Sequence, residues 1–119
     1  MSLRRTLGMI AFLLIAATLV FAQGKESQLR TVRGTVVDST ENPVETGVVY
    51  LRNSRTQDVT THLSDSDGTF RFSGLDLNAN YEIHAEKDGW TSATRSISNF
   101  DTRKEFVLTL KLDRKKGGK

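Results

Sequence analysis

Apolar and polar residues alternate one by one along most of this chain, and this alternation constrains its fold more than any other feature. Val32, Gly34 and Val36, for example, are separated by Arg33 and Thr35. Successive side chains of a strand point to opposite faces, so a period of two predicts strands with one packed and one solvated face. No sustained helical period follows. Strands are predicted at 32–36, 47–52, 69–72, 81–86, 93–97 and 106–112, with a more polar seventh strand at 59–63.

Turn-forming residues separate these runs at the spacing of a small all-β domain. The clearest turns are Glu41-Asn42-Pro43, which holds the only proline, and the Ser-Asp-Ser-Asp-Gly stretch at 64–68. Aspartate bonds to nearby backbone N–H groups and glycine tolerates positive φ. Short strands at this spacing predict a sandwich or small barrel. The expected core is Val32, Val36, Val49, Leu51, Phe70, Phe72, Leu75, Tyr81, Ile83, Ile97, Phe106, Leu108 and Leu110.

The first 22 residues have a different pattern. Arg4 and Arg5 precede an uninterrupted run of low polarity from Leu7 to Ala22, whose final Val-Phe-Ala puts small or aliphatic residues where a signal peptidase reads. This order is typical of a secretory signal peptide. A membrane anchor is the alternative, but a spanning helix needs about 20 apolar residues and the run from 7 to 22 has 16. Cleavage after Ala22 is therefore expected.

The length of 119 residues allows one domain. The predicted division is a signal peptide at 1–22, a polar linker at 23–29, one β-sandwich domain at 30–113 and a basic flexible tail at 114–119. The signal predicts export to the periplasm or out of the cell. No second apolar run follows it, so no membrane span is expected after cleavage.

The excess of positive over negative charge lies at the two ends of the chain. The sequence has 17 Lys+Arg and 14 Asp+Glu, and removal of Arg4 and Arg5 leaves a net charge of 15 − 14 = +1. A basic C-terminal run is typical of a solvated end, with attraction to acidic polymers or a membrane surface as the alternative. No basic stripe carries interleaved aromatic residues, so specific nucleic-acid binding is not expected. The basic residues near the end are Lys111, Arg114, Lys115, Lys116 and Lys119.

Few residues in this chain carry chemistry. It has no cysteine, which excludes disulfides, thiol nucleophiles and cysteine-bound metals. His62 and His84 are the only histidines, and both are expected on solvated strand faces. His84 and Glu86 would lie about 7 Å apart on one face, which is half of a metal site. Serine-hydrolase, phosphate-loop and dinucleotide motifs are absent. We therefore predict no enzymatic activity, no cofactor and no metal.

The aspartate-rich turn at 64–68 looks like a fragment of a calcium loop. An EF-hand loop needs glycine at its sixth position, and setting Gly68 there puts Leu63 at the first, where a carboxylate is required. A hairpin turn is the better interpretation. A looser calcium site that includes Asp76 is the alternative.

Trp90 is the only tryptophan and follows Gly89 at the start of a strand. Apolar faces of sugars pack on aromatic rings, so an exposed tryptophan beside polar residues is typical of a carbohydrate platform. The alternative is a tryptophan that caps one end of the sandwich. The candidate contacts to a carbohydrate or protein partner are Trp90, Thr91 and Arg95.

Several short motifs occur in a recognisable order: Gly34-Thr-Val-Val-Asp38, Asn42-Pro43-Val44, Val49-Tyr-Leu51, the run SDSDGTFRF at 64–72, Gly74-Leu75 and Tyr81-Glu-Ile83. This ordered set resembles the carboxypeptidase regulatory-like domain from about Arg30 to Leu112. The resemblance implies a transthyretin-like, Ig-like Greek-key sandwich, grouped with carbohydrate-binding-like folds and without catalytic residues of its own. The chain departs from the family at Asn42 and Thr46, where the family has glycine.

Together these observations predict an all-β chain: a seven-stranded, antiparallel Greek-key β-sandwich behind a signal helix. Tyr81 is expected to pack its ring inward with its hydroxyl at the rim, as in a tyrosine corner. The expected function is a non-catalytic, exported interaction module that meets an unknown protein partner. A carbohydrate-binding module that uses Trp90 is the alternative, and a regulator or chaperone that works by strand addition is a third hypothesis.

Overall fold

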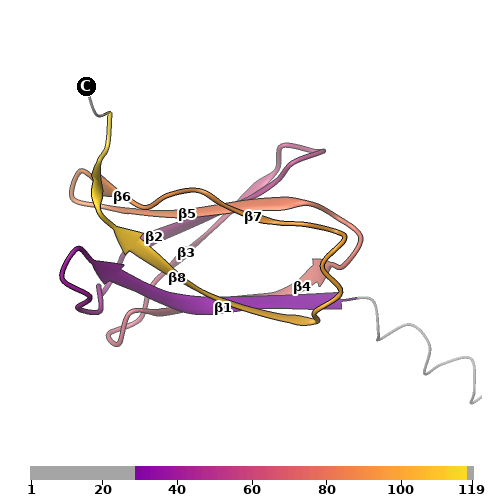
Figure 1. The fold of residues 1–119 in the computed structure, drawn as a ribbon, viewed down its shortest axis with the longest axis horizontal. Helices are drawn as coiled ribbons and strands as arrows, with labels where there is room; N and C mark the ends of the chain where they lie inside the picture. The colour runs from indigo at the N-terminus through magenta and orange to yellow at the C-terminus, as the bar shows by residue number, and fades with distance from the viewer. Residues whose placement is uncertain (1–28, 118–119) are drawn as a thin grey trace, which may run out of the picture.

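A computed structural model describes residues 29–117, in which the alternating runs form two β-sheets packed face to face (Figure 1). All seven predicted strands are present. The described residues contain nine strands, which are β1 (Leu29–Asp38), β2 (Val48–Asn53), β3 (Val59–Leu63), β4 (Thr69–Asp76), β5 (Tyr81–Lys87), β6 (Trp90–Thr91), β7 (Arg95–Ile97), β8 (Glu105–Leu112) and β9 (Arg114–Lys115).

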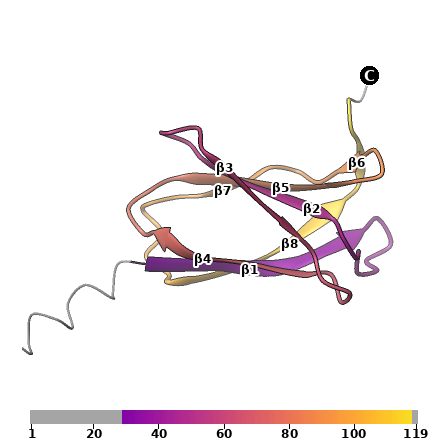
Figure 2. The same ribbon diagram turned by 180° about the vertical axis from the view of Figure 1, so that it is seen from behind.

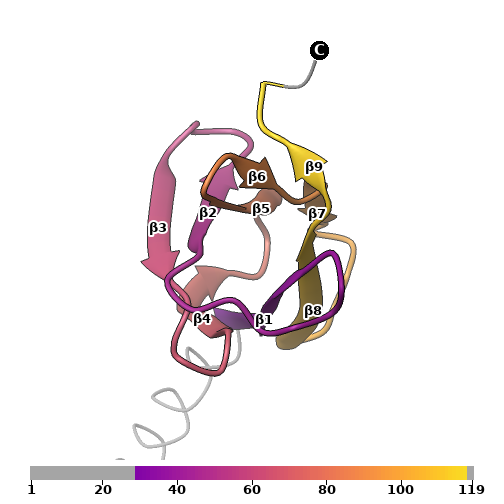
Figure 3. The same ribbon diagram turned by 90° about the vertical axis from the view of Figure 1, so that its left-hand side faces the viewer.

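The smaller sheet has the strand order β4-β1-β8, and the larger has the order β3-β2-β5-β6-β9, with β7 also paired to β5. Seen from behind, β1 and β4 run side by side below the strands of the larger sheet (Figure 2). The end-on view shows the two layers and places β3 at the outer edge of the larger sheet (Figure 3). The predicted β-sandwich is confirmed.

Two details differ from the prediction of seven antiparallel strands. β1 and β8 pair in parallel, from Thr31 opposite Glu105 to Asp38 opposite Leu112. Parallel and antiparallel neighbours can show the same alternation, so the pattern could not reveal the direction of this pair. The two additional strands, β6 and β9, have two residues each and are too short to show a period.

Two strands reach outside the segment 30–113 that was predicted as the β-sandwich domain. β1 begins at Leu29, the last residue assigned to the linker, and β9 lies within the segment 114–119 that was predicted to be a flexible tail. The signal peptide predicted at 1–22 and the linker residues 23–28 lie outside the described residues. Within 29–117, no helix is long and apolar enough to cross a membrane.

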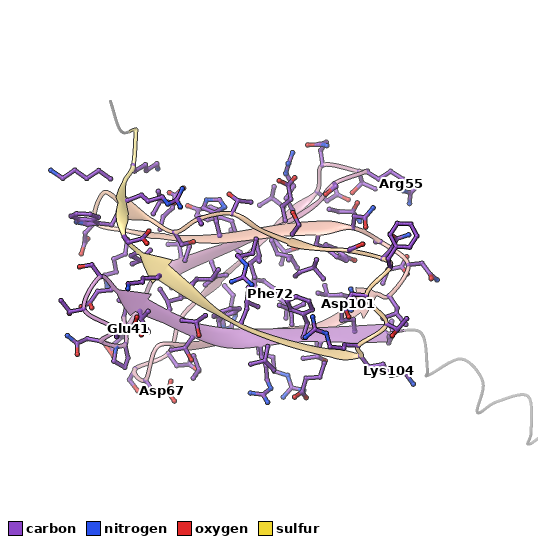
Figure 4. All side chains as sticks on the ribbon, viewed as in Figure 1. Glu41, Arg55, Asp67, Phe72, Asp101 and Lys104 are labelled. Carbon is purple, nitrogen blue, oxygen red and sulfur yellow. The ribbon has the colours of Figure 1, made fainter. Side chains whose placement is uncertain are left out.

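The core lies between the two sheets, where Figure 4 shows Phe72. Every residue predicted for the core is buried except Leu75, which is partly buried near the end of β4. The Tyr81 side chain is buried, and its hydroxyl accepts a hydrogen bond from the N–H of Asp76 at 3.0 Å, as a tyrosine corner requires. Val37, Ala85 and Leu112 are also buried.

β1 and β8 approach each other closely at Gly34. A Cβ atom built on Gly34 would lie 1.8 Å from the carbonyl oxygen of Leu108, so no other residue fits there without moving the strands apart. This glycine is required by the packing of two strands rather than by a turn.

Arg30 is a buried charged residue that the alternation did not single out. Its side chain is 1% exposed, and its guanidinium donates hydrogen bonds to the carbonyl oxygens of Arg103 at 2.9 Å, Ser98 at 3.2 Å and Asp101. The donors of a buried arginine need partners, and each guanidinium nitrogen of Arg30 has one among three backbone carbonyls of a single loop. Arg30 thereby fixes the β7–β8 connection to the start of β1.

Candidate functional site

A shallow pocket of about 310 Å³ lies at the end of the sandwich where Trp90 is found. Its apolar part consists of Val44, Leu112 and the Trp90 ring, which is 40% exposed. Its polar lining comes from Asp38 and Ser39 at the end of β1 and from Lys87 and Asp88 at the end of β5.

The turn between β5 and β6 positions Trp90 in this pocket. Lys87 pairs with Trp90, so Asp88 and Gly89 form a two-residue hairpin loop, and their φ values are 51° and 82°. Positive φ at both central residues is the requirement of a type I′ turn, for which Asp-Gly is a preferred sequence. The local sequence therefore brings the Lys87 ammonium and the Asp88 carboxylate beside the tryptophan ring.

Hydrogen bonds to neighbouring loop residues hold two polar side chains of the pocket in place. The Asp38 carboxylate accepts hydrogen bonds from the N–H groups of Asn42 and Thr40 and from the Thr40 hydroxyl. These bonds, that of Asn42 first, lower the pKa of Asp38, so the carboxylate is negative at neutral pH. The Lys87 ammonium donates to the carbonyl of Glu45 and to the hydroxyl of Thr46.

The C-terminal segment lies next to Trp90. β9 pairs with β6, with Lys115 opposite Trp90, and the Lys115 ammonium is 5.9 Å from the centre of the Trp90 ring. The Lys116 ammonium is 2.9 Å from Oε1 of Glu86. A ligand that stacks on Trp90 would therefore also meet the basic residues of β9.

The structure does not bring the three predicted contact residues together. Thr91 follows Trp90 in a strand and points to the opposite face, where its hydroxyl donates to the carbonyl of Ala85 at 3.2 Å. Arg95 pairs with Ile83, four positions along β5 from Lys87, and does not line the Trp90 pocket. The pocket residues that sequence reasoning missed are Asp38, Ser39, Val44, Lys87, Asp88 and Leu112.

His84 and Glu86 lie on one strand face, as predicted, with Nε2 and Oε2 2.9 Å apart. Glu86 also binds Lys116, and this hydrogen bond is the main reason that the pKa of Glu86 is lowered. The His84 ring stacks on Tyr50 with centroids 4.9 Å apart. No group of three or more metal-ligating side chains is found within residues 29–117.

The aspartate-rich turn carries the chain from β3 in the larger sheet to β4 in the smaller one. The two strands do not pair, so the predicted hairpin is wrong, although the turn itself is closed by the N–H of Gly68 and the carbonyl of Asp65 at 2.9 Å. The Asp67 carboxylate accepts hydrogen bonds from the N–H of Thr69 at 3.1 Å and from its hydroxyl at 2.6 Å. These bonds, the hydroxyl first, lower the pKa of Asp67. Gly68 has a φ of 81°, which is the conformation expected of it in this turn. Figure 4 shows Asp67 at the tip of the turn, away from the core.

The second candidate surface is the free edge of the larger sheet, strand β3. β3 pairs with β2 on one side and has no strand on its other side in the described part of the chain (Figure 3). All five of its residues are exposed, and Val59 and Leu63 are each 55% exposed. The sequence Val-Thr-Thr-His-Leu contains no Asp, Glu, Lys, Arg or proline, which are residues that protect natural edge strands from pairing.

The hydrogen bonds of β3 to β2 determine which backbone groups are free. At one end of this pair the N–H of Asn53 donates to the carbonyl of Asp58, and at the other the N–H of Ser64 donates to the carbonyl of Gly47. Bonded and non-bonded pairs alternate along an antiparallel pair, so every second residue of β3 directs its N–H and C=O away from β2. These residues are Val59, Thr61 and Leu63.

Fold and surface together define a small β-sandwich domain with an open sheet edge and a pocket at one end. The chain belongs to the carboxypeptidase regulatory-like domain family, whose model matches residues 31–113. This confirms the family that the ordered motifs indicated. No curated protein matches the chain.

Solved structures of several different proteins contain a similar sandwich. The chlorocatechol 1,2-dioxygenase from Pseudomonas putida matches with a TM-score of 0.58 and 14% identity, over 73% of this chain and 61% of that one. The major pilin subunit BcpA of Bacillus cereus matches with a TM-score of 0.55 and 16% identity, over 73% of this chain and 30% of the pilin. The pilus 2b backbone protein of group B streptococcus matches with a TM-score of 0.53 and 16% identity, over 72% of this chain and 41% of that one. At these identities the likeness concerns the fold alone.

Proposed function

We propose that this domain is a non-catalytic, exported interaction module that receives an extended segment of a protein partner on the free edge of β3. The observation that carries the proposal is the set of outward-facing backbone groups at Val59, Thr61 and Leu63 on a strand without charged residues. Strand addition gives affinity through backbone hydrogen bonds and selectivity through alternate side chains. A partner strand would meet the exposed side chains of Val59 and Leu63 on one face of the sheet.

A pair of substitutions at Thr61 tests this function. Thr61→Pro removes the outward N–H while leaving the bonds between β3 and β2 intact, because proline is tolerated where the N–H of an edge strand faces solvent. Thr61→Val keeps the N–H and the branched side chain. We expect extended peptides of alternating apolar and hydroxyl residues to bind the unchanged protein and Thr61→Val, and to lose binding to Thr61→Pro. Equal binding to all three forms, or binding to none of them by a chain that also stays monomeric, contradicts the proposal.

Export is the second part of the proposal, supported by the charged, apolar and small-residue order of residues 1–22. Mass spectrometry of the protein purified from its native cell measures the N-terminus directly. We expect a chain that begins at Gln23 and is found outside the cytoplasm. A chain that still begins at Met1 contradicts export by cleavage.

Carbohydrate binding at Trp90 is a second candidate function, favoured by the pocket itself. A half-exposed tryptophan, an apolar floor and two carboxylates near a lysine form a combination that can pack on a sugar face and bond to its hydroxyls. A glycan array of the unchanged protein, Trp90→Ala and Arg95→Ala tests it. Binding that is lost in Trp90→Ala and kept in Arg95→Ala supports this function, whereas no binding by the unchanged protein discards it.

A further inference from the structure

We infer that the occupant of the β3 edge is the β3 strand of a second copy of this chain, which forms a symmetric antiparallel dimer. The inference rests on the proposed function, because it names the partner of the same edge. Most soluble homo-oligomers are closed and symmetric, and a twofold dimer places the same surface of both copies in contact. The edge must then be complementary to itself.

The sequence of β3 meets this condition in one register. With the twofold axis at Thr61, each Val59 lies opposite Leu63 of the second copy, and Thr61 lies opposite its own equivalent. These are the residues whose N–H and C=O point outward, so each opposed pair exchanges two hydrogen bonds. A shift by one residue in either direction would oppose outward-facing groups to residues already bonded to β2, and a shift by two would lose one bonded pair.

The side chains fit the same register. Val59 and Leu63 lie on the outer face, where they are exposed in the single chain and would cover each other across the new strand pair. Thr60 and His62 would oppose each other on the inner face, next to the edge-to-face contact of His62 with Phe72 at 6.0 Å. Apolar and threonine pairs directly across a sheet stabilise it, and no like charges within 59–63 oppose one another.

The size of the contact predicts a weak dimer. Five residues on each side bury much less than the roughly 1,200 Å² at which stable interfaces begin, so association belongs to the transient class. In the dimer the two larger sheets join into one continuous sheet through β3.

Sedimentation equilibrium of the protein, expressed with its own N-terminal segment and purified as the host processes it, tests the inference. We expect a reversible monomer–dimer equilibrium that Thr61→Pro weakens by more than about tenfold and Thr61→Val leaves within about threefold. Circular dichroism and the melting temperature of Thr61→Pro show whether its fold is retained. A protein that stays monomeric at millimolar concentration, or a dimer that a folded Thr61→Pro variant does not weaken, overturns the inference.

Two charge substitutions test the register. Val59→Lys alone and Leu63→Glu alone should each weaken the dimer, because each puts a charge opposite an apolar side chain. The double variant Val59→Lys, Leu63→Glu should recover association, since both cross-strand contacts then become Lys–Glu pairs. A double variant no stronger than either single variant overturns this register.

The two proposals fail differently. If the chain remains monomeric but binds extended peptides in a manner sensitive to Thr61→Pro, the self-pairing is wrong and the interaction module stands. If neither self-association nor peptide binding depends on Thr61→Pro, both are wrong.

Discussion

Among single residues, Arg30 shows most clearly how a polar side chain can organise a core. Its guanidinium reaches three carbonyls of the β7–β8 connection and is almost completely buried. Figure 4 shows Asp101 and Lys104 in the connection that it holds. Its donors reach backbone carbonyls, and its charge also acts on the nearby Asp101 carboxylate, whose pKa it helps to lower.

Replacing Arg30 should therefore destabilise the domain more than its position at the start of β1 implies. Arg30→Met retains much of the apolar volume but leaves three buried or partly buried carbonyls without donors, which we expect to cost about 3 kcal/mol. Denaturant unfolding measures the change. Arg55→Ala, at the exposed tip of the β2–β3 hairpin (Figure 4), is the control and should stay within about 0.5 kcal/mol of the unchanged protein.

For single residues, the sequence predicted which side chains are buried much better than it predicted which side chains contact each other. The alternation identified nearly every core residue, because side-chain direction in a strand follows from position alone. It could not show that Asp38 lies beside Trp90, since nothing local relates residues 52 positions apart (90 − 38). That Trp90 and Thr91 point to opposite faces could have been predicted from the sequence, because neighbouring residues in a strand do so. The burial of Arg30 carried no signal, since arginine is usually exposed.

Among the elements, β9 was not predicted from the sequence, and it lies beside the candidate pocket. Two residues without an apolar pattern form it, and its backbone pairs with β6. Lys115 lies over the Trp90 ring, and Lys116 binds Glu86. The segment that was predicted as a basic tail from its composition is thus attached to the sheet by strand pairing with β6 and by the Lys116–Glu86 ion pair.

Removing β9 should change the environment of Trp90. A chain truncated after Asp113 loses the strand opposite Trp90 and the ammonium above its ring, so the ring should become more accessible to a neutral quencher and its emission should shift to longer wavelength. The chain has one tryptophan, so the fluorescence reports on this site alone. A truncation of residues 117–119 is the control. Identical quenching of both truncated chains would show that β9 does not cover the ring.

The strands themselves were predictable, and their relations were only partly so. Each of the seven predicted runs is a strand. Six of them showed a period of two between turns, and the seventh, 59–63, is a more polar run between turns. The parallel direction of β8 beside β1 was missed, since direction depends on the path of the chain between them. The only sequence signal for the free edge of β3 was the unusually polar run at 59–63.

At the scale of the whole molecule, carboxylates with lowered pKa values connect stability to pH. Asp101 is the strongest case, because the Arg103 side chain and then its N–H hold the pKa of that carboxyl well below its ordinary 3.8. Hydrogen bonds also lower the pKa of Asp38 and Asp67 below 3.8, and that of Glu86 below 4.5. Each of these carboxyl groups therefore binds its proton more tightly in the unfolded chain than in the folded one.

The free energy of unfolding should be constant at pH values above the ordinary pKa values of these carboxyls. It should fall as the pH drops through their lowered pKa values in the folded state. The contribution is present while the groups are ionised in the folded state and is lost when they are protonated. Denaturant unfolding between about pH 6 and pH 2 measures this dependence. Asp101→Asn should make the acid slope shallower. An Asp101→Asn slope as steep as that of the unchanged protein would contradict the assignment.

The parallel pair of β1 and β8 also governs when the domain can fold. Val32 lies opposite Phe106, which follows it by 106 − 32 = 74 residues. A chain made from its N-terminus has nothing to place beside one edge of β1 until almost all of it has emerged. Contacts between distant residues slow folding, because a long loop must close before they form. β1 therefore gains β8 as its neighbour only after residues 105–112 have been made, and the domain completes its core late in synthesis.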